Sequence, residues 1–106
     1  MIMSDNRKYQ IIISDRAKRM LAEHIRFLAK VNPESARKKK QQIIGELRSL
    51  SVFPQRFPFF EDSFIPHNKY HKMYIENRYL VLYQIKDNTV VVDYILDCRK
   101  DYNWLL

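Results

Sequence analysis

The stretch RYLVLYQI, residues 78–85, decides the fold. Its apolar side chains fall on both alternating sets of positions, whereas a strand with one wet face alternates apolar and polar residues. The stretch therefore predicts a central strand that is covered on both faces. Turn residues bound it, at 76–77 before it and at 86–88 after it. Two more strands are expected across these turns, over residues 69–75 and 89–96, so that the last three strands form a meander.

Upstream of this meander, the chain predicts one more strand and two helices. Residues 9–13, YQIII, are rich in β-branched side chains, and Ser14 is a plausible N-cap for a helix over 15–31. NPES, residues 32–35, interrupts this helix and starts a second, because Asn32 can cap it with a proline at its first position. On both helices apolar side chains recur every three or four residues: Ala17, Met20, Leu21, Ile25 and Leu28, then Ala36, Ile43, Ile44, Leu47 and Leu50. The break is so short that the two helices must form an antiparallel hairpin.

Between the helices and the meander lies VFPQRFPFFEDSFIPHN, residues 52–68. Its three prolines exclude regular structure, and its five phenylalanines are too many for a disordered linker. We expect an ordered connection packed over the core. The element order is then β-α-α-β-β-β in one domain, 1–106: an α+β fold with a helical hairpin packed on one face of a small antiparallel sheet.

The composition of the chain limits the classes of function that it can have. The net charge of +7 and the pI of about 9.6 favour acidic partners, namely nucleic acid, an acidic protein surface or an anionic membrane. The only glycine, Gly45, lies in a helical pattern, which excludes glycine-rich phosphate loops. A lone cysteine, Cys98, indicates a reducing setting, and neither a secretory signal nor a membrane-spanning run of about 20 apolar residues is visible. We expect a cytoplasmic protein that uses no membrane, and we interpret Cys98 as a small packing residue rather than a nucleophile.

Few residues suggest chemistry. The three histidines, His24, His67 and His71, lack the spacing of zinc sites, so no metal and no cofactor is expected. A basic and aromatic surface on the sheet remains, and it suits either nucleic acid or a protein partner. Tyr79 and Tyr83 are predicted to be core or half-core residues. For His71 and for the RKKK run at 37–40, a plain surface role and a role in a site both stay open.

The chain resembles the RelE/ParE superfamily of toxins from bacterial type II toxin–antitoxin systems, and it is closer to the ParE-like branch. The resemblance covers about residues 8–106. Its pieces, in order, are YQIIISDRAKRML, NPESA, ELRSLSVFP, NRYLVLYQI and ILDCRKDY. RelE-like members cut mRNA on the ribosome without a metal, whereas ParE-like members poison DNA gyrase and are not nucleases. The resemblance implies an antitoxin partner in both cases.

The nuclease pattern fits this chain poorly. Its third-strand arginine would fall at Leu80, and the basic residues of the preceding strand would fall at His71 and Met73. CRKDY at 98–102 keeps the cysteine, arginine and tyrosine of one nuclease subgroup, but Asp101 stands where a histidine would be. If the protein is a nuclease, the candidates for catalysis are His71, Arg78, Arg99, Asp101 and Tyr102.

The ParE-like pattern has an apolar residue after the third-strand tyrosine, and its last strand runs into basic residues and an aspartate. This chain has both features, although Cys98 and Lys100 replace the more usual glycine and arginine. We therefore expect a toxin that binds DNA gyrase and is neutralised by a cognate antitoxin. The alternative is a ribosome-dependent mRNA interferase, whose target is the translating ribosome with its mRNA. The residues expected to bind the target are Arg99, Lys100, Tyr102, Trp104, Lys72 and Arg78. An antitoxin with acidic residues is expected to wrap over the helices and the sheet.

Overall fold

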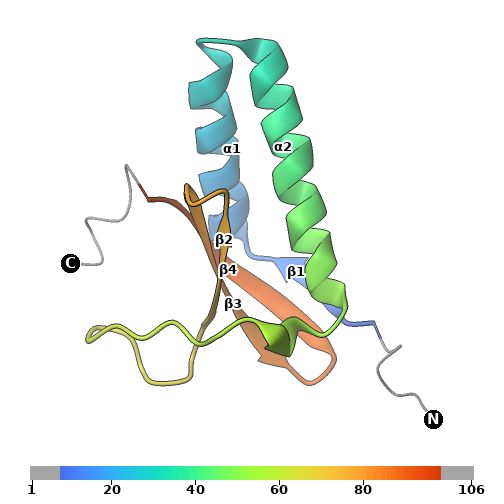
Figure 1. Cartoon of the computed structure of the whole chain (residues 1–106), viewed down its shortest axis with the longest axis vertical. Helices are drawn as coiled ribbons and strands as arrows, with labels where there is room; N and C mark the ends of the chain where they lie inside the picture. Colours follow the sequence, from blue (N-terminus) through green and yellow to red (C-terminus); the bar gives the residue numbers. More distant parts are fainter. Residues whose placement is uncertain (1–7, 99–106) are drawn as a thin grey trace.

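The computed structural model describes residues 8–98, and it has two helices packed on a four-stranded sheet (Figure 1). The strands are β1 (Gln10–Ile13), β2 (His71–Ile75), β3 (Tyr79–Lys86) and β4 (Thr89–Asp97), and the helices are α1 (Asp15–Ala29) and α2 (Pro33–Arg48). Two short 3₁₀ turns, η2 (Ser49–Ser51) and η3 (Pro54–Arg56), follow α2. The predicted order β-α-α-β-β-β and the α+β class are confirmed. Neither helix in the described part is long and apolar enough to cross a membrane.

The sheet is mixed rather than purely antiparallel. Its strand order is β1-β4-β3-β2, and β1 pairs with β4 in parallel, with Gln10 opposite Thr89 and Ile13 opposite Val92. β2, β3 and β4 form the expected antiparallel meander. The side-chain pattern of YQIII predicts a strand but carries no information about its neighbour. The parallel pair is possible because the helical hairpin and the long loop supply the crossover that parallel strands need.

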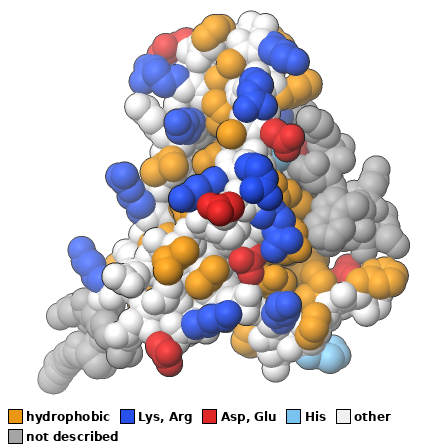
Figure 2. Space-filling model, turned by 180° about the vertical axis from the view of Figure 1, so that it is seen from behind, with side chains coloured by type: hydrophobic (Ala, Val, Ile, Leu, Met, Phe, Trp, Pro, Cys, Tyr) orange, Lys and Arg blue, Asp and Glu red, His pale blue; other side chains and the backbone are white. Residues whose placement is uncertain are grey.

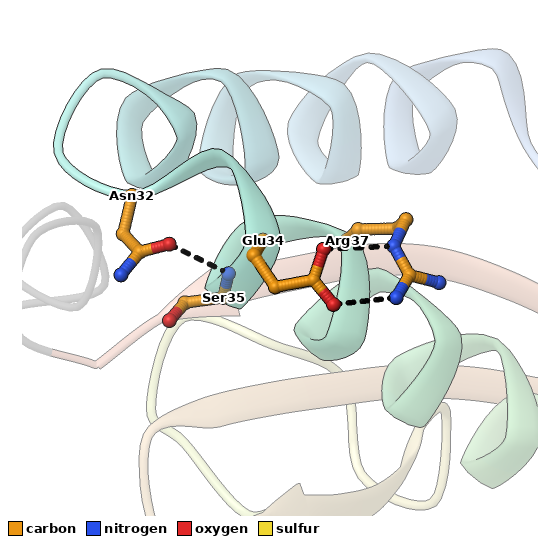
Figure 3. A network of polar contacts seen from close by, with 4 residues as sticks. All are labelled: Asn32, Glu34, Ser35 and Arg37. Carbon is orange, nitrogen blue, oxygen red and sulfur yellow. Dashed lines mark hydrogen bonds and ion pairs between the residues drawn. The ribbon is translucent and has the colours of Figure 1, made fainter.

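Capping residues set the ends of both helices. Ser14 Oγ accepts a hydrogen bond from the N–H of Ala17 at 3.0 Å, and Asn32 Oδ1 accepts one from the N–H of Ser35 at 3.1 Å (Figure 3). α1 ends at Ala29, two residues before the predicted end, because the carbonyl of Leu28 accepts from the N–H groups of both Val31 and Asn32. This tight turn reverses the chain and makes the antiparallel hairpin, whose closed end extends beyond the sheet (Figure 1).

The sheet buries both faces. One face packs against the helices through a core that contains Tyr79 and Tyr83, both fully buried as predicted. Further members of this core are Ala17, Leu21, Ile43, Leu47, Leu50, Met73, Ile75, Val81 and Ile95. We call the smaller cluster on the opposite face the second-face cluster: Phe60, Tyr70, Leu80, Leu82 and Leu96. Burial of the sheet on both faces explains why both alternating sets of positions in RYLVLYQI carry apolar side chains.

The loop that follows the helices provides the second cover. Phe60 belongs to the second-face cluster, and its N–H donates to the carbonyl of Tyr70 at 2.7 Å. Ile65 packs against the same cluster. At the other end of the loop, the hydroxyl of Tyr83 donates to the carbonyl of Pro54 at 2.7 Å. The expectation of an ordered connection packed over the core is confirmed.

α1 also seals the edge of β4 beyond the end of the short strand β1. The Ser14 hydroxyl and the Arg16 Nε donate to the carbonyl of Asp93, at 3.3 and 3.4 Å. Further along, His24 Nε2 lies 2.8 Å from the carbonyl of Ile95, and since a carbonyl only accepts, Nε2 carries the proton. These side chains take the place of a missing strand neighbour, so the second half of β4 does not present an open edge.

Candidate functional site

Five residues singled out from the sequence follow β4, and they lie outside the described residues: Arg99, Lys100, Asp101, Tyr102 and Trp104. The structure does show where this segment starts. β4 ends at Asp97, and the N–H of Cys98 donates to the carbonyl of Arg78 at 2.7 Å. The first residue of the segment is therefore tied to the beginning of β3, in the sheet.

Arg78 and Asp97 form an ion pair at the end of β4, which we call the exit point. Arg78 Nη2 lies 3.4 Å from Asp97 Oδ2, and the Asp97 side chain is 5% exposed. The guanidinium carbon of Arg78 also lies 5.0 Å from the ring centre of Tyr79. A buried carboxylate needs a compensating charge. Arg78 thus neutralises Asp97 and fixes the end of β4. The charge of Arg78, which was a candidate for binding a scissile phosphate, is therefore already engaged in an ion pair.

His71 is buried, so a plain surface role for it is wrong. Its Nδ1 lies 2.7 Å from the carbonyl of Phe57, and its ring packs between Phe59 and Tyr83, with centroid distances of 4.3 and 5.3 Å. Because the carbonyl accepts, Nδ1 is the protonated nitrogen. The histidine fastens the loop to the start of β2. This role could not be inferred from the residue pattern, because the partner is a backbone atom 14 residues away.

Lys72 and Tyr74 are the residues of β2 that point to the second face and stay accessible. Lys72 is half-buried, and Tyr74 is 44% exposed. Loop residues cover the neighbouring Tyr70, which is 6% exposed. Neither face of the sheet is therefore free over its whole area, and on β2 the accessible basic and aromatic side chains of the second face are Lys72 and Tyr74.

A polar cluster on the second face was not foreseen from the sequence. The guanidinium carbon of Arg16 lies 4.1 Å from the ring centre of Tyr94, and Gln84 Nε2 donates to Asp93 Oδ2 at 2.7 Å. Tyr70 meets Tyr94 edge to face, with centroids 5.9 Å apart. Burial, assisted by the Asp93 carboxylate, raises the pKa of Tyr70 to about 12. This phenol therefore stays protonated at neutral pH and does not serve as a base.

Cys98 has the environment of a packing residue. It is partly buried against the second-face cluster. Burial, followed by the adjacent Asp97 carboxylate, raises the pKa of the thiol. The thiol is then protonated at neutral pH, and a protonated thiol is a poor nucleophile and a poor metal ligand. No group of three or more potential metal ligands occurs within residues 8–98.

An apolar groove with a basic rim runs between the two helices. Its volume is about 510 Å³, and its floor consists of Ile13, Leu21, Ala22, Ile25 and Ile44. Lys18, Arg26 and Lys40 stand around this floor. Viewed from behind, Lys and Arg side chains surround apolar ones over the hairpin (Figure 2). The helix periodicity had assigned Leu21, Ile25 and Ile44 to the core. Leu21 is buried there as expected, whereas Ile25 and Ile44 pack against the core but are only half-buried, and all three line the groove.

The four cations of the RKKK run, residues 37–40, lie in different environments. Arg37 pairs with Glu34 one turn earlier, at 2.6 Å (Figure 3), and Lys39 pairs with Glu76 in the β2–β3 turn. Lys38 is exposed, and Lys40 belongs to the groove rim. Four consecutive cations cover more than one helical turn, so they point in different directions. Only Lys40 shares a surface with apolar side chains that a partner could cover.

Comparison with known proteins agrees with this geometry. The family described as "ParE toxin of type II toxin-antitoxin system, parDE" matches residues 11–102. A solved chain from the "Chromosomal ParDE TA system from P. aeruginosa" superposes with a TM-score of 0.71, covering 87% of this chain and 98% of that chain. The two are 14% identical in sequence, so this likeness shows a shared fold. No curated protein sequence matches the chain.

The family match spans most of the chain, from β1 to beyond β4. It includes both helices that form the groove and the exit point at Arg78 and Asp97. The resemblance expected from the sequence, to the ParE-like branch of the RelE/ParE superfamily, is confirmed. The chain belongs to the ParE toxin family of type II toxin–antitoxin systems.

Proposed function

We propose that this toxin inhibits growth by binding DNA gyrase, and that a cognate antitoxin encoded beside it holds it inactive. The observation that carries the proposal is the ParE family match over residues 11–102. The net charge of +7 supports an acidic partner for a protein of this size.

The packing of the sheet argues against the alternative, a ribosome-dependent mRNA interferase. Leu80 and Met73 stand at positions where the nuclease pattern has basic residues, and they are 0% and 2% exposed. His71 is held against the Phe57 carbonyl, and Arg78 is paired with Asp97. RNA cleavage needs cations near the scissile phosphate together with an acid and a base within hydrogen-bond reach of it. Within residues 8–98 the nuclease positions hold buried or engaged side chains.

We assign target binding to the exit of β4 and the segment after it. The proposed contacts are Arg99, Lys100, Tyr102 and Trp104, together with Lys72 and Arg78 on the sheet. Lys72 is a half-buried cation on β2, two residues from the accessible Tyr74. Arg78 acts chiefly by fixing the start of the segment, through its carbonyl bond to Cys98 and its ion pair with Asp97.

Two assays on the purified toxin distinguish gyrase inhibition from mRNA cleavage. The gyrase proposal predicts inhibition of DNA supercoiling and intact mRNA on translating ribosomes. In the Arg99→Ala/Lys100→Ala variant the concentration needed for half inhibition should rise at least about tenfold, the equivalent of 1.4 kcal/mol. Lys38→Ala is the matched control, because Lys38 is an exposed cation on α2, outside the proposed surface. Cleaved mRNA together with unaffected gyrase would overturn the proposal in favour of the interferase.

The groove between the helices is the surface we assign to the antitoxin. Its apolar floor suits the apolar face of an amphipathic helix, and its rim of Lys18, Arg26 and Lys40 suits acidic residues beside that face. Reversing the three charges to glutamate should abolish rescue of growth by the product of the neighbouring gene. The control reverses Arg19, Lys30 and Lys38, three exposed cations that do not line the groove. Equal rescue of both triple variants would contradict this assignment while leaving the gyrase proposal standing.

A further inference from the structure

Phe53, between the two 3₁₀ turns, has a backbone conformation that residues with a side chain rarely adopt. Its φ is 48° and its ψ is 60°, in the left-handed region. A bulky aromatic residue is strained there, and the proline that follows restricts the position further. Within residues 8–98 the other non-glycine residues with a positive φ are all polar: Asn68, Glu76, Asn77 and Asp87.

Burial of the side chain does not compensate for this strain. Phe53 is 62% exposed, and its neighbour Val52 is 48% exposed. Strained residues cluster at sites that bind a ligand or a partner, and adjacent exposed apolar side chains mark contact surfaces. The strain and the exposure together indicate that the Phe53 ring contacts something other than its own fold.

The surrounding chain fixes Phe53 in this conformation. The guanidinium of Arg56 donates to the carbonyl of Val52 at 2.5 Å and to the carbonyl of Phe53 at 3.1 Å. On the other side, the buried hydroxyl of Tyr83 donates to the carbonyl of Pro54 at 2.7 Å. The ring is therefore presented on a backbone that is already held in place, so that little conformational entropy is lost when a partner covers it.

The surface around Phe53 is basic. Residues 47–60 include Arg48 and Arg56, which are both exposed, and no Asp or Glu. Lys8 adds a third exposed cation, because the residue after it is hydrogen-bonded to the end of η2. An aromatic ring among cations suits a protein partner that places an apolar side chain between carboxylates.

Phe53 also lies within reach of the groove between the helices. Ile13, at one end of β1, lines that groove. At the other end, the N–H of Tyr9 donates to the carbonyl of Ser51 at 2.8 Å, and Figure 1 shows the last turns of α2 beside β1. The strand covers about 13 Å at 3.3 Å per residue, so roughly six extended residues of a partner span the distance from the groove to Phe53.

The route along β1 offers backbone hydrogen bonds to such a segment. β1 is an edge strand, and the N–H groups of Gln10 and Ser14 donate toward β4. Alternate residues of a strand bond to the same neighbour, so the N–H and C=O of Ile11 point away from β4. The outer edge of a strand is a template for an extended partner.

We propose that Phe53, with Val52, is an anchor for the antitoxin outside the groove. An acidic segment of the antitoxin leaves the groove, follows the outer edge of β1 and covers the Phe53 ring with an apolar side chain. This inference rests on the assignment of the groove to the antitoxin. Because the ring serves binding rather than folding, its removal should weaken the complex and leave the fold intact.

Replacing Phe53 with glycine separates these two effects. Calorimetric titration of the purified full-length toxin with the product of the neighbouring gene should give a Kd at least about tenfold higher for Phe53→Gly than for the wild type. The midpoint of chemical denaturation should equal or exceed the wild-type value, because glycine adopts a positive φ without strain. Phe64→Gly is the matched control: Phe64 is 74% exposed on the long loop beside the second-face cluster, and its loss should leave the Kd unchanged.

The possible failures have different signatures. A wild-type Kd for Phe53→Gly would overturn the proposal, and so would an equal loss of affinity in Phe64→Gly. A lower denaturation midpoint for Phe53→Gly would show that the ring serves the fold. Unchanged antitoxin binding together with weaker gyrase inhibition would assign Phe53 to gyrase instead. A wild-type toxin that does not bind the antitoxin would refute the proposed function on which the inference rests.

Discussion

Replacing His24 with leucine tests how α1 is held to the edge of β4. The imidazole is 5% exposed, and its Nε2 donates to the Ile95 carbonyl at 2.8 Å. Leucine fills much of the same space but has no donor, so the buried carbonyl loses this hydrogen bond. Leaving a buried acceptor without a partner costs about 1–3 kcal/mol. The tilted contact between the His24 and Tyr79 rings, with centroids 5.4 Å apart, is lost as well, and aromatic pairs contribute about 0.5–1.5 kcal/mol.

The expected loss of unfolding free energy is therefore at most roughly 1.5–4.5 kcal/mol, the sum of the two ranges above, and the greater hydrophobicity of leucine offsets part of it. Chemical denaturation at constant pH, with an unchanged m-value, measures it. The matched control is His67→Leu. The side chain of His67 is 91% exposed and pairs with Glu61, so its loss should change stability by no more than about 0.5 kcal/mol. If His24→Leu were as stable as the wild type, the sealing of β4 by α1 would contribute nothing, and our account of this edge would be wrong.

Two further predictions follow from shifted pKa values. Burial and the Asp93 carboxylate raise the pKa of Tyr70 to about 12, above the ordinary value of about 10; the protonated phenol therefore stabilises the fold fully below pH 10, and this contribution disappears as the pH rises toward 12. Tyr70→Phe should remove that part of the alkaline loss of stability, as measured by denaturation from pH 9 to pH 12, and an identical alkaline profile in both proteins would contradict the assignment. Because burial raises the pKa of the Cys98 thiol, a disulfide reagent at neutral pH should label the native protein much more slowly than the protein in denaturant. Equal labelling rates in the two states would show that the thiol is not protected by packing.

Much of the fold could be predicted because the periodic patterns are strong. RYLVLYQI indicated burial on both faces, and the structure supplies both covers, the helices on one face and the loop on the other. Ser14 and Asn32 marked the helix starts through their own side chains, which is why these boundaries agree with the structure. These features depend on local chemistry, so a single sequence contains them.

Long-range partners were beyond reach of the same reasoning. That β1 lies parallel to β4 depends on the path of the whole intervening chain. His71 and His24 bond to backbone carbonyls 14 and 71 residues away, and a carbonyl has no sequence signature. One available signal was missed: His24 occupies a position in the apolar stripe of α1, where a polar side chain must find a buried partner.

The candidate site was predictable only in its outline. The segment after β4 was identified by its charges and aromatic residues, and the structure adds the way in which Arg78 and Asp97 fix its starting point. The groove between the helices could not be predicted from the sequence, because Leu21, Ile25 and Ile44, which line it, have the spacing of ordinary core residues. Whether a helical apolar residue is buried or lines a groove depends on how the neighbouring helix packs against it.

The central claim, that the toxin acts on gyrase through the segment after β4, is tested most directly by truncation. The full-length chain and a chain ending at Cys98, which keeps every described residue, are titrated into a gyrase supercoiling reaction at matched folded concentration. We predict that the full-length toxin inhibits supercoiling and that the truncated chain does not. Equal inhibition by the two proteins would remove the site from residues 99–106, and a full-length toxin without effect on gyrase would contradict the proposed target itself.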